Sequence, residues 1–286
     1  MPEYPKPPYP AQRQPMPGAT AKMNPRPDHG ETSYKGSGKL AGKKAVITGG
    51  DSGIGRAVAI AYAREGADIL IAYLDEHQDA QEVKGLVEHE GRKAVLVAGD
   101  LRSPQHCRAV IKQAVDVLGG IDILINNAAH QATFKDIGDI SDEEWQLTFE
   151  VNIHAMFYLT KAAVPHMKPG SAIINTGSVT GIEGSKYLLD YSMTKGGIHA
   201  FTRSLSANLI PKGIRVNCVA PGPVWTPLNP ADRQADDVAK FGQQSAMKRA
   251  AQPEEIAPAY VFLAAPSCSS YITGEIVPII GGYSGG

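Results

Sequence analysis

The chain has 286 residues, of which 43% are hydrophobic and 20% charged, and its formal net charge is −1. A charge this close to zero argues against a broad basic surface for nucleic acid and against a cationic face for a membrane, and no apolar run reaches the roughly 18 residues that span a bilayer. The cysteines Cys107, Cys218 and Cys268 lie far apart without a CxxC spacing, which argues against a disulfide framework or a metal site and favours a reducing, cytoplasmic location.

Residues 1–40 are predicted to form a proline-rich N-terminal arm. Proline restricts φ and removes backbone donors, so we expect extended, polyproline-like coil rather than helix or sheet. Two alternatives stay open for this arm. It is either a disordered tail or a strap that lies along a neighbouring subunit through residues such as Tyr4 and Tyr9.

From residue 41 to 286 the sequence alternates between apolar runs and helical patterns. The alternation predicts a doubly wound, parallel α/β sheet in one domain, because apolar runs without strict alternation indicate strands that are covered on both faces. The predicted strands lie at about 43–48, 67–73, 93–99, 121–127, 171–177, 213–222 and 275–280. The predicted helices lie at about 53–66, 77–90, 104–118, 142–168, 190–210 and 253–266. Residues 223–249 break the alternation and are predicted to form a substrate lid.

A glycine cluster, TGGDSGIG, follows the first predicted strand. Gly49 permits a tight turn, Gly53 removes a side chain where a pyrophosphate would approach, and Gly55 lets the helix pack closely on the sheet. The first amides of that helix favour an anion. Glycines also make plain strand-to-helix turns, but the position between a strand and a helix predicts a dinucleotide site.

Tyr191 and Lys195 in the stretch YSMTK lie one helical turn apart, and therefore on one face of the helix predicted there. An ordinary surface pair is the alternative interpretation. A lysine ammonium favours the phenolate of a neighbouring tyrosine and so lowers its pKa from about 10. General acid–base catalysis near neutral pH requires such a shift. The pair therefore predicts a catalytic proton donor or acceptor.

These motifs together resemble the short-chain dehydrogenase/reductase family. They are TGGDSGIG, NNAA at 126–129, Asn152, Ser178, Tyr191-xxx-Lys195 and Pro221-Gly222, in the order and spacing of that family. The resemblance covers about 40–286 and is nearest to bacterial glucose/ribitol dehydrogenase-like oxidoreductases with a Pro-rich N-terminal extension. It implies a Rossmann-type sheet of seven strands and a nicotinamide cofactor. It also implies a homotetramer in which residues 275–286 pack near a symmetry axis.

The resemblance also assigns roles to single residues. Tyr191 would be the general acid or base, and Lys195 would lower its pKa and bind the nicotinamide ribose. Ser178 would position the substrate oxygen, and Asn152 would support a water molecule near the lysine. The implied cofactor contacts are Gly49, Asp51, Ser52, Gly53, Ile54, Gly55, Tyr73, Leu74, Asp75, Asp100, Leu101, Asn127, Ala128, Ala129, Tyr191, Lys195, Pro221, Gly222, Val224 and Thr226. Candidates for the substrate pocket, with ordinary loop packing as the alternative, are His130, Gln131, Glu183, Tyr187 and Trp225.

Cofactor choice depends on the end of the second predicted strand. Tyr73 stands where the family has an acid for the adenosine ribose, and Leu74 stands where an arginine often binds a 2′-phosphate. Asp75 and Glu76 follow, at about the distance past the glycine cluster expected of a ribose-binding acid. The sequence therefore favours NAD over NADP, with Arg56 as the residue that could still reach a 2′-phosphate.

The predicted function is that of an NAD(P)-dependent oxidoreductase. It would interconvert an alcohol (a sugar, a polyol or a small alcohol) and a carbonyl compound by hydride transfer. Its partner would be a small molecule, without a metal, a nucleic acid or a membrane. The alternative is a non-catalytic dinucleotide-binding sensor or scaffold on the same fold. A nucleotide-sugar epimerase fits less well, because only about 60 residues follow Gly222, too few for the substrate domain of such enzymes.

Overall fold

The computed structural model describes residues 3–283, so the last three residues of the predicted 275–286 contact lie outside it. Seven parallel strands form one sheet in the order β3-β2-β1-β4-β5-β6-β7. Their bounds are β1 Lys44–Thr48, β2 Asp68–Tyr73, β3 Ala94–Ala98, β4 Ile123–Asn126, β5 Ala172–Thr176, β6 Arg215–Pro221 and β7 Ile276–Ile279. The prediction of a Rossmann-type, seven-stranded, doubly wound sheet is confirmed.

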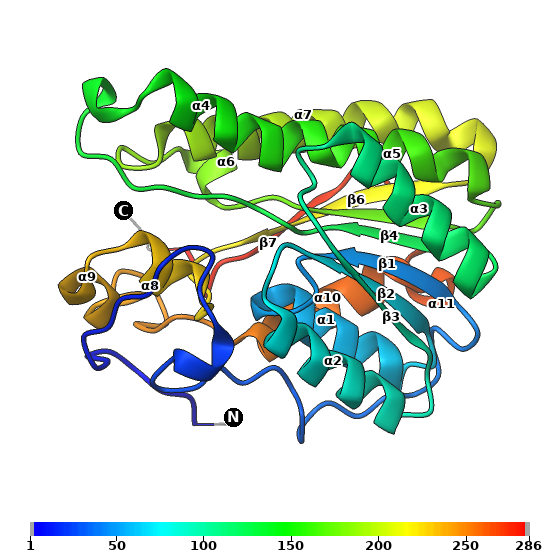
Figure 1. The fold of residues 1–286 in the computed structure, drawn as a ribbon, viewed down its shortest axis with the longest axis horizontal. Coiled ribbons are helices and arrows are strands. Elements are labelled where there is room, and N and C mark those ends of the chain that lie inside the picture. The colour runs from blue at the N-terminus through cyan, green and yellow to red at the C-terminus, as the bar shows by residue number, and fades with distance from the viewer. Residues whose placement is uncertain (1–2, 284–286) are drawn as a thin grey trace.

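Helices cover both faces of this sheet (Figure 1). One layer holds α1 Gly53–Arg64, α2 His77–His89, α10 Pro253–Ala264 and α11 Pro266–Ser269; the other holds α3 Pro104–Leu118, α4 Asp142–Phe149, α5 Ala155–Ala163 and α7 Leu189–Leu209. Successive strand residues enter opposite layers, so Val46 packs in the core on one face and Ile47 in the core on the other. Both residues are fully buried, which explains why the strand reads as a continuous apolar run.

The strand order changes direction between β1 and β4. The chain builds β2 and β3 outward on one side of β1 and then returns to pair β4 on its other side. In a doubly wound sheet this switch point leaves a crevice at the carboxyl ends of the strands, where ligands bind. Thr48, Asn126 and Thr176 end three neighbouring strands at this edge.

The predicted helix at about 142–168 is interrupted in the structure. A five-residue π-helical segment, Glu150–His154, separates α4 from α5, and a 3₁₀ turn, Val164–His166, ends the run. A π segment inserts an extra residue into a helix and is common at functional sites. Asn152 lies in this segment and is buried. One extra residue in a helical turn barely changes an apolar pattern, so the sequence does not reveal the interruption.

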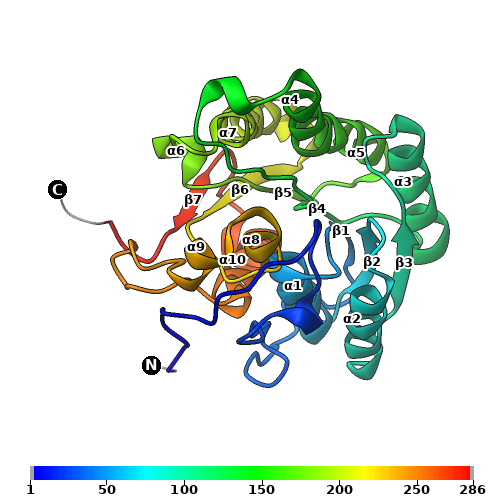
Figure 2. The ribbon, with the colours of Figure 1, turned by 60° about the vertical axis from the view of Figure 1, so that its left-hand side comes forward.

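The N-terminal arm packs on its own chain, which differs from both sequence-based alternatives. Apart from a 3₁₀ turn at Thr20–Lys22, its described residues form neither helix nor strand, as the prolines predict. The ring of Tyr9 lies 4.2 Å from the ring of Trp225, and the Trp225 indole N–H donates to the carbonyl of Pro25 at 2.8 Å. Figure 2 shows the arm crossing α8 (Leu228–Asp232) and then turning toward α1.

Of the two alternatives left open for Trp225, the structure favours packing over a place in the substrate pocket. The indole is completely buried and its polar edge is satisfied by the arm. The arm also binds the backbone of residues 223–249, the segment predicted to form a lid and called the lid below. Tyr9 N donates to Ala239 O at 2.9 Å and Gln14 N donates to Pro230 O at 2.8 Å. The lid, residues 223–249, contains α8 and α9 (Ala235–Ala239), and the arm lies along both of them.

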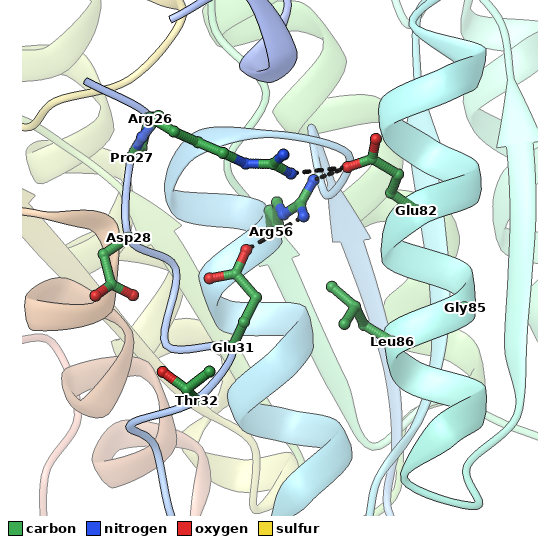
Figure 3. A pocket seen from close by; sticks show the side chains of 9 residues that line it. All are labelled: Arg26, Pro27, Asp28, Glu31, Thr32, Arg56, Glu82, Gly85 and Leu86. Atoms are coloured by element: carbon green, nitrogen blue, oxygen red, sulfur yellow. Dashed lines mark hydrogen bonds and ion pairs between the residues drawn. The ribbon is translucent and has the colours of Figure 1, made fainter. Parts of the chain in front are cut away.

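A second contact region joins the arm to α1 and α2. Figure 3 shows the Arg56 guanidinium between Glu31 of the arm and Glu82 of α2, at 3.2 and 3.1 Å. Arg26 of the arm also pairs with Glu82, at 3.0 Å. These groups border an open pocket of about 660 Å³. Arg56 has only 2% of its surface exposed, and both of its ion pairs are to carboxylates of this region. Its guanidinium is therefore not free to turn toward a cofactor.

No helix among residues 3–283 combines the length and apolar character needed to cross a membrane.

Candidate active site

The glycine cluster forms a close-fitting loop between β1 and α1. Gly49 has φ +60° and Gly53 has φ +50°, a region that side chains other than glycine rarely adopt. A Cβ at Gly55 would lie 2.0 Å from the carbonyl oxygen of Gly49, and a Cβ at Gly53 would lie 3.1 Å from Thr226. The Ser52 side chain makes no capping bond, so the first amides of α1 keep their capacity to bind an anion.

Asn127 holds this loop in place. Its side-chain amide donates to the carbonyls of Thr48 at 3.0 Å and Gly49 at 3.2 Å, and its backbone N–H donates to the Thr48 hydroxyl at 2.9 Å. Ala128 N donates to the same hydroxyl at 3.0 Å. The first residues after β4 therefore support the glycine loop, and a Cβ at Gly49 would lie 3.2 Å from Cα of Ala128.

The end of β2 is acidic. Tyr73 is buried and its hydroxyl is hydrogen-bonded to the His77 ring at 3.0 Å, whereas Leu74 and Asp75 are exposed. Asp51 of the glycine loop is also buried, and burial, reinforced by the charges of Glu76 and Asp79, raises its pKa to about 7. Of the two carboxylates expected to face the adenosine ribose, Glu76 therefore lies close enough to Asp51 to raise its pKa, whereas Asp75 is not among the groups that do so.

Asp100 and Leu101 follow β3, on the same edge of the sheet. The Asp100 carboxylate accepts a hydrogen bond from Arg102 Nε at 2.7 Å, and this bond lowers the pKa of the carboxyl group. Leu101 is 9% exposed and packs in the core under α3. Arg102 was missed by the sequence analysis, although it stands only two positions after Asp100.

Tyr191 and Lys195 lie on one face of α7, as predicted. The Lys195 ammonium is 5.2 Å from the centre of the Tyr191 ring and donates to the carbonyl of Thr176 at 2.8 Å. Lys195 has 1% of its surface exposed and Tyr191 has 9%. The pair is therefore buried at the carboxyl end of β5, which excludes an ordinary surface pair.

The expected lowering of the Tyr191 pKa is wrong for the structure in hand. Burial raises the pKa of Tyr191 to about 12; the Ser178 hydroxyl opposes this and the Asp232 carboxylate adds to it. Burial also lowers the pKa of Lys195 to about 8. Desolvation is the largest cause for both groups, and desolvation disfavours the charged form of each.

Ser178 and Asn152 complete the predicted catalytic set. Ser178 follows β5, is 7% exposed, and accepts hydrogen bonds from Thr180 N at 3.1 Å and from the Thr180 hydroxyl at 3.0 Å. The Asn152 side chain accepts from His130 N at 2.7 Å, and its amide donates to His130 O at 2.9 Å and to Thr194 at 3.1 Å. Asn152 thus links the loop after β4 to α7, and it lines a small cavity together with Lys195.

The segment after β6 borders the glycine loop. A Cβ at Gly222 would lie 3.0 Å from Ile280, so close packing requires glycine there. The Val224 carbonyl accepts from the Asn229 side chain at 2.7 Å, and Thr226 lies against Gly53. Thr226 therefore lies beside the glycine loop, while the cofactor contacts of Pro221, Gly222 and Val224 stay predictions.

The remaining pocket candidates separate into bonded and exposed residues. The His130 ring is paired with Glu144 at 2.7 Å, and Gln131 donates to Asp232 of α8 at 2.6 Å. Glu183 is exposed, and Tyr187 is 45% exposed. His130 and Gln131 thus belong to the polar loop after β4.

Two further residues near the site were missed by the sequence analysis. Tyr260 of α10 makes a 2.7 Å hydrogen bond between its hydroxyl and that of Thr176, directly under the Lys195 contact. Asp232 of the lid reaches the loop after β4. Neither residue lies in a motif, and both belong to segments far from Lys195 in the sequence, so no spacing indicated them. Among the described residues, no group of three or more His, Cys, Asp or Glu side chains is arranged to hold a metal ion.

Comparison with known proteins places this arrangement in a family. A family model described as enoyl-(acyl carrier protein) reductase matches residues 49–284. General stress protein 39 of Bacillus subtilis is 51% identical over 99% of this chain and 98% of its own. Two Arabidopsis thaliana relatives are glucose and ribitol dehydrogenase homolog 2 and NADPH-dependent aldehyde reductase 1, chloroplastic. The first is 47% identical, covering 96% of this chain and 97% of its own; the second is 46% identical, covering 93% and 95%.

Solved structures of short-chain dehydrogenases have the same fold as this chain. A short-chain dehydrogenase from Burkholderia cenocepacia in complex with NADP superposes with a TM-score of 0.80 and 31% identity, covering 85% of this chain and 98% of its own. The chain belongs to the short-chain dehydrogenase/reductase family and is an oxidoreductase of that class with a dinucleotide site. The glycine loop fits a dinucleotide, because a Cβ at Gly53 would fill the space next to the loop that a pyrophosphate needs.

Proposed function

We propose that the protein is an NAD(P)-dependent oxidoreductase that interconverts an alcohol and a carbonyl compound, with Tyr191 as the general acid or base. The observation that carries the proposal is the burial of Tyr191, Lys195 and Ser178 together at the carboxyl edge of the sheet, beside the glycine loop. When bound, a nicotinamide supplies the hydride donor or acceptor. The names of the plant relatives point to sugars, polyols or aldehydes as substrates.

The proposed roles of the protein's own residues are to position the substrate and to move its proton. Ser178 would hydrogen-bond the substrate oxygen and hold it near the Tyr191 hydroxyl. With a pKa of about 12, Tyr191 is protonated at neutral pH and is ready to donate a proton in the direction of carbonyl reduction. In the direction of alcohol oxidation it must first lose that proton, which positive charge nearby favours. Lys195 supplies such charge, and Asn152 fixes the loop that faces it.

A panel of alcohols, sugars and aldehydes, followed at the nicotinamide absorbance band with both cofactors, tests the proposal. We expect turnover of at least one alcohol–carbonyl pair, and its loss in the Tyr191→Phe variant. Binding of a cofactor without turnover of any member of the panel would contradict the proposal and favour the sensor or scaffold. The intact set of Ser178, Tyr191 and Lys195 is the reason to prefer the enzyme.

We further propose that NAD is preferred over NADP. Asp51, Glu76 and Asp79 interact with one another at the ribose end, and carboxylates repel a 2′-phosphate. Arg56, the cation that could neutralise it, is already paired with Glu31 and Glu82. Each 1.4 kcal/mol of lost binding lowers affinity about tenfold. Fluorescence titration with both oxidised cofactors measures the preference, and equal or tighter NADP binding would contradict it.

The assembly is proposed to be a cytoplasmic homotetramer, with residues 223–249 acting as the substrate lid. Large apolar side chains remain exposed on α4 and α7, among them Trp145 at 41% and Met193 at 58%. Exposed apolar surface of this kind is commonly covered by another subunit. Light scattering of the purified protein measures the mass, and a monomer would contradict this assembly.

A further inference from the structure

Asp232 occupies a fixed position at the inner end of the lid. It is the last residue of α8, a short helix that is held at two other points. Asn229 donates from its side chain to the carbonyl of Val224, and the arm residue Gln14 donates its backbone N–H to the carbonyl of Pro230. These contacts hold α8 from its outer side, so the position of Asp232 does not depend on its own side-chain bonds alone.

The carboxylate of Asp232 spans the opening between the lid and the loop after β4. One oxygen, Oδ2, accepts from the Gln131 amide at 2.6 Å and from the Thr133 hydroxyl at 2.7 Å. Gln131 directly follows His130, whose backbone is bound on both sides by Asn152. The lid carboxylate is therefore attached to the same loop that the catalytic asparagine holds.

Asp232 also faces the reacting groups. Its charge is one of the causes that raise the pKa of Tyr191, after burial, which places the carboxylate within electrostatic range of the phenol. Lys195 of α7 is buried and bonded to Thr176, and the guanidinium of Arg233, which follows Asp232, lies 5.2 Å from the centre of the Phe241 ring. The His130 ring is paired with Glu144. The segment 223–249 therefore presents the Asp232 carboxylate toward the reacting groups, and we expect a substrate that extends past the reacting carbon to meet it.

A carboxylate has about four acceptor positions. Gln131 and Thr133 take up positions on Oδ2, and the rest of the group can accept from a ligand hydroxyl. A substrate hydroxyl would donate to it as a charge-assisted hydrogen bond. A substrate carboxylate or phosphate at the same point would have no proton to donate and would be repelled.

We propose that Asp232 determines substrate charge: it selects uncharged substrates that carry a hydroxyl group beyond the reacting carbon, and it rejects the corresponding anions. This inference rests on the proposed oxidoreductase function and narrows its substrate class to neutral polyhydroxy compounds. It assigns a specificity role to a lid residue that lies outside every motif of the family resemblance.

The test compares glucose with glucuronate, two probes that differ in the hydroxyl and carboxylate at one end. For the full-length wild-type protein with bound cofactor, we expect glucose to have the higher kcat/KM by about a hundredfold. In the Asp232→Asn variant, which keeps the size of the side chain, we expect this ratio to narrow at least tenfold, mainly through a lower KM for glucuronate.

Asp236→Asn is the matched control. Asp236 is an exposed lid carboxylate in the first turn of α9, so the variant removes the same charge from the same segment. Its glucose-to-glucuronate ratio should equal that of the wild type. If Asp232→Asn lowers kcat/KM equally for both probes, Asp232 only holds the lid in place and the inference is wrong.

Calorimetric titration of both probes into the cofactor-bound protein separates this inference from the proposed function. If no probe is turned over but glucose still binds more tightly than glucuronate, and Asp232→Asn removes the difference, the specificity role holds and the oxidoreductase proposal fails. Turnover of both probes with equal kcat/KM by the wild type overturns the specificity role and leaves the oxidoreductase intact. Binding of neither probe, by either variant, also overturns it.

Discussion

Two regions of the molecule are held together in different ways: the edge of the sheet proposed to be catalytic, called the catalytic edge below, and the layer formed by the arm and the lid. At the catalytic edge, Tyr191 and Lys195 are neighbours on one helix, and Ser178 follows the strand that this helix covers. In the outer layer, Tyr9 stacks on Trp225 and Glu31 pairs with Arg56, contacts that join segments far apart in the chain.

This difference distinguishes contacts that are expected to affect the reaction rate from contacts that are expected to affect the stability of the fold. The groups at the catalytic edge are polar, buried and positioned by backbone elements, so a change there should alter the rate more than the stability. The arm contributes stacking, backbone hydrogen bonds and ion pairs around α1, α2 and the lid. A change there should alter stability more than rate. Three experiments separate these expectations.

Tyr191→Phe should have the largest effect and should act on chemistry alone. We expect a loss of kcat of about 10²- to 10⁴-fold, the range associated with removal of a general acid or base. Cofactor affinity should stay within a few-fold, because the ring still fills the same buried volume. Steady-state kinetics and a cofactor titration measure the two quantities. Tyr271→Phe, which alters a fully exposed tyrosine, is the control, and substantial activity in Tyr191→Phe would show that another group moves the proton.

Deletion of residues 1–35 should lower stability and leave the chemistry largely unchanged. The deletion exposes Trp225 and removes the buried side chains Tyr9 and Met23. Burial of side chains of this size is worth about 1.5–3 kcal/mol each, offset by the cost of ordering the arm. At about 2–4 °C per kcal/mol, we expect Tm to fall by roughly 5–10 °C.

A thermal melt and an activity assay at 25 °C, where turnover should be near normal, measure this separation. Tyr4→Phe, which removes only the hydroxyl bonded to Glu254, is the control for the arm and should melt close to the wild type. An unchanged melt after the deletion would mean that the arm contacts contribute nothing to stability. A loss of turnover that matches the loss in Tyr191→Phe would mean that the two regions are not separable.

Asp51→Asn should have the smallest effect on the melting temperature, and the size of that effect depends on pH. Folding raises the pKa of Asp51 from 3.8 to about 7, so the folded state binds more protons than the unfolded state between these values. The free energy of unfolding therefore falls as pH rises from about 4 to 7. Asparagine does not ionise, so the variant does not lose unfolding free energy in this way. Without cofactor, its Tm should be a few degrees higher than that of the wild type at pH 8 and equal to it at pH 4.

Calorimetry at the two pH values measures that difference. Asp75→Asn, which removes an exposed carboxylate from the same edge of the sheet, is the matched control. A variant at Asp51 that melts no higher than the wild type at pH 8 would contradict the burial of an ionised Asp51 in the folded protein.

The sequence predicted the sheet and the catalytic edge well because both depend on short-range patterns. Apolar runs separated by helices predicted the seven strands, and the spacing of Tyr191 and Lys195 predicted their shared helix face. The π segment at Asn152 was not predicted, because one extra residue in a helical turn barely changes an apolar pattern. The direction of the Tyr191 pKa shift was also wrong, since burial is not visible in the residue spacing.

What the sequence by itself determined is the order of strands and helices, the glycine loop and the identity of the groups that meet beside it. Hydrophobic periodicity and the conformational preferences of residues act over a few neighbouring positions, so the linear sequence is enough to predict their effect. Only the tertiary structure decided that Trp225 anchors the arm, that Arg56 is held by two carboxylates, and that Asp232 reaches Gln131. Each of these contacts joins side chains from different segments, and their partners are selected by the space that the folded sheet leaves between them.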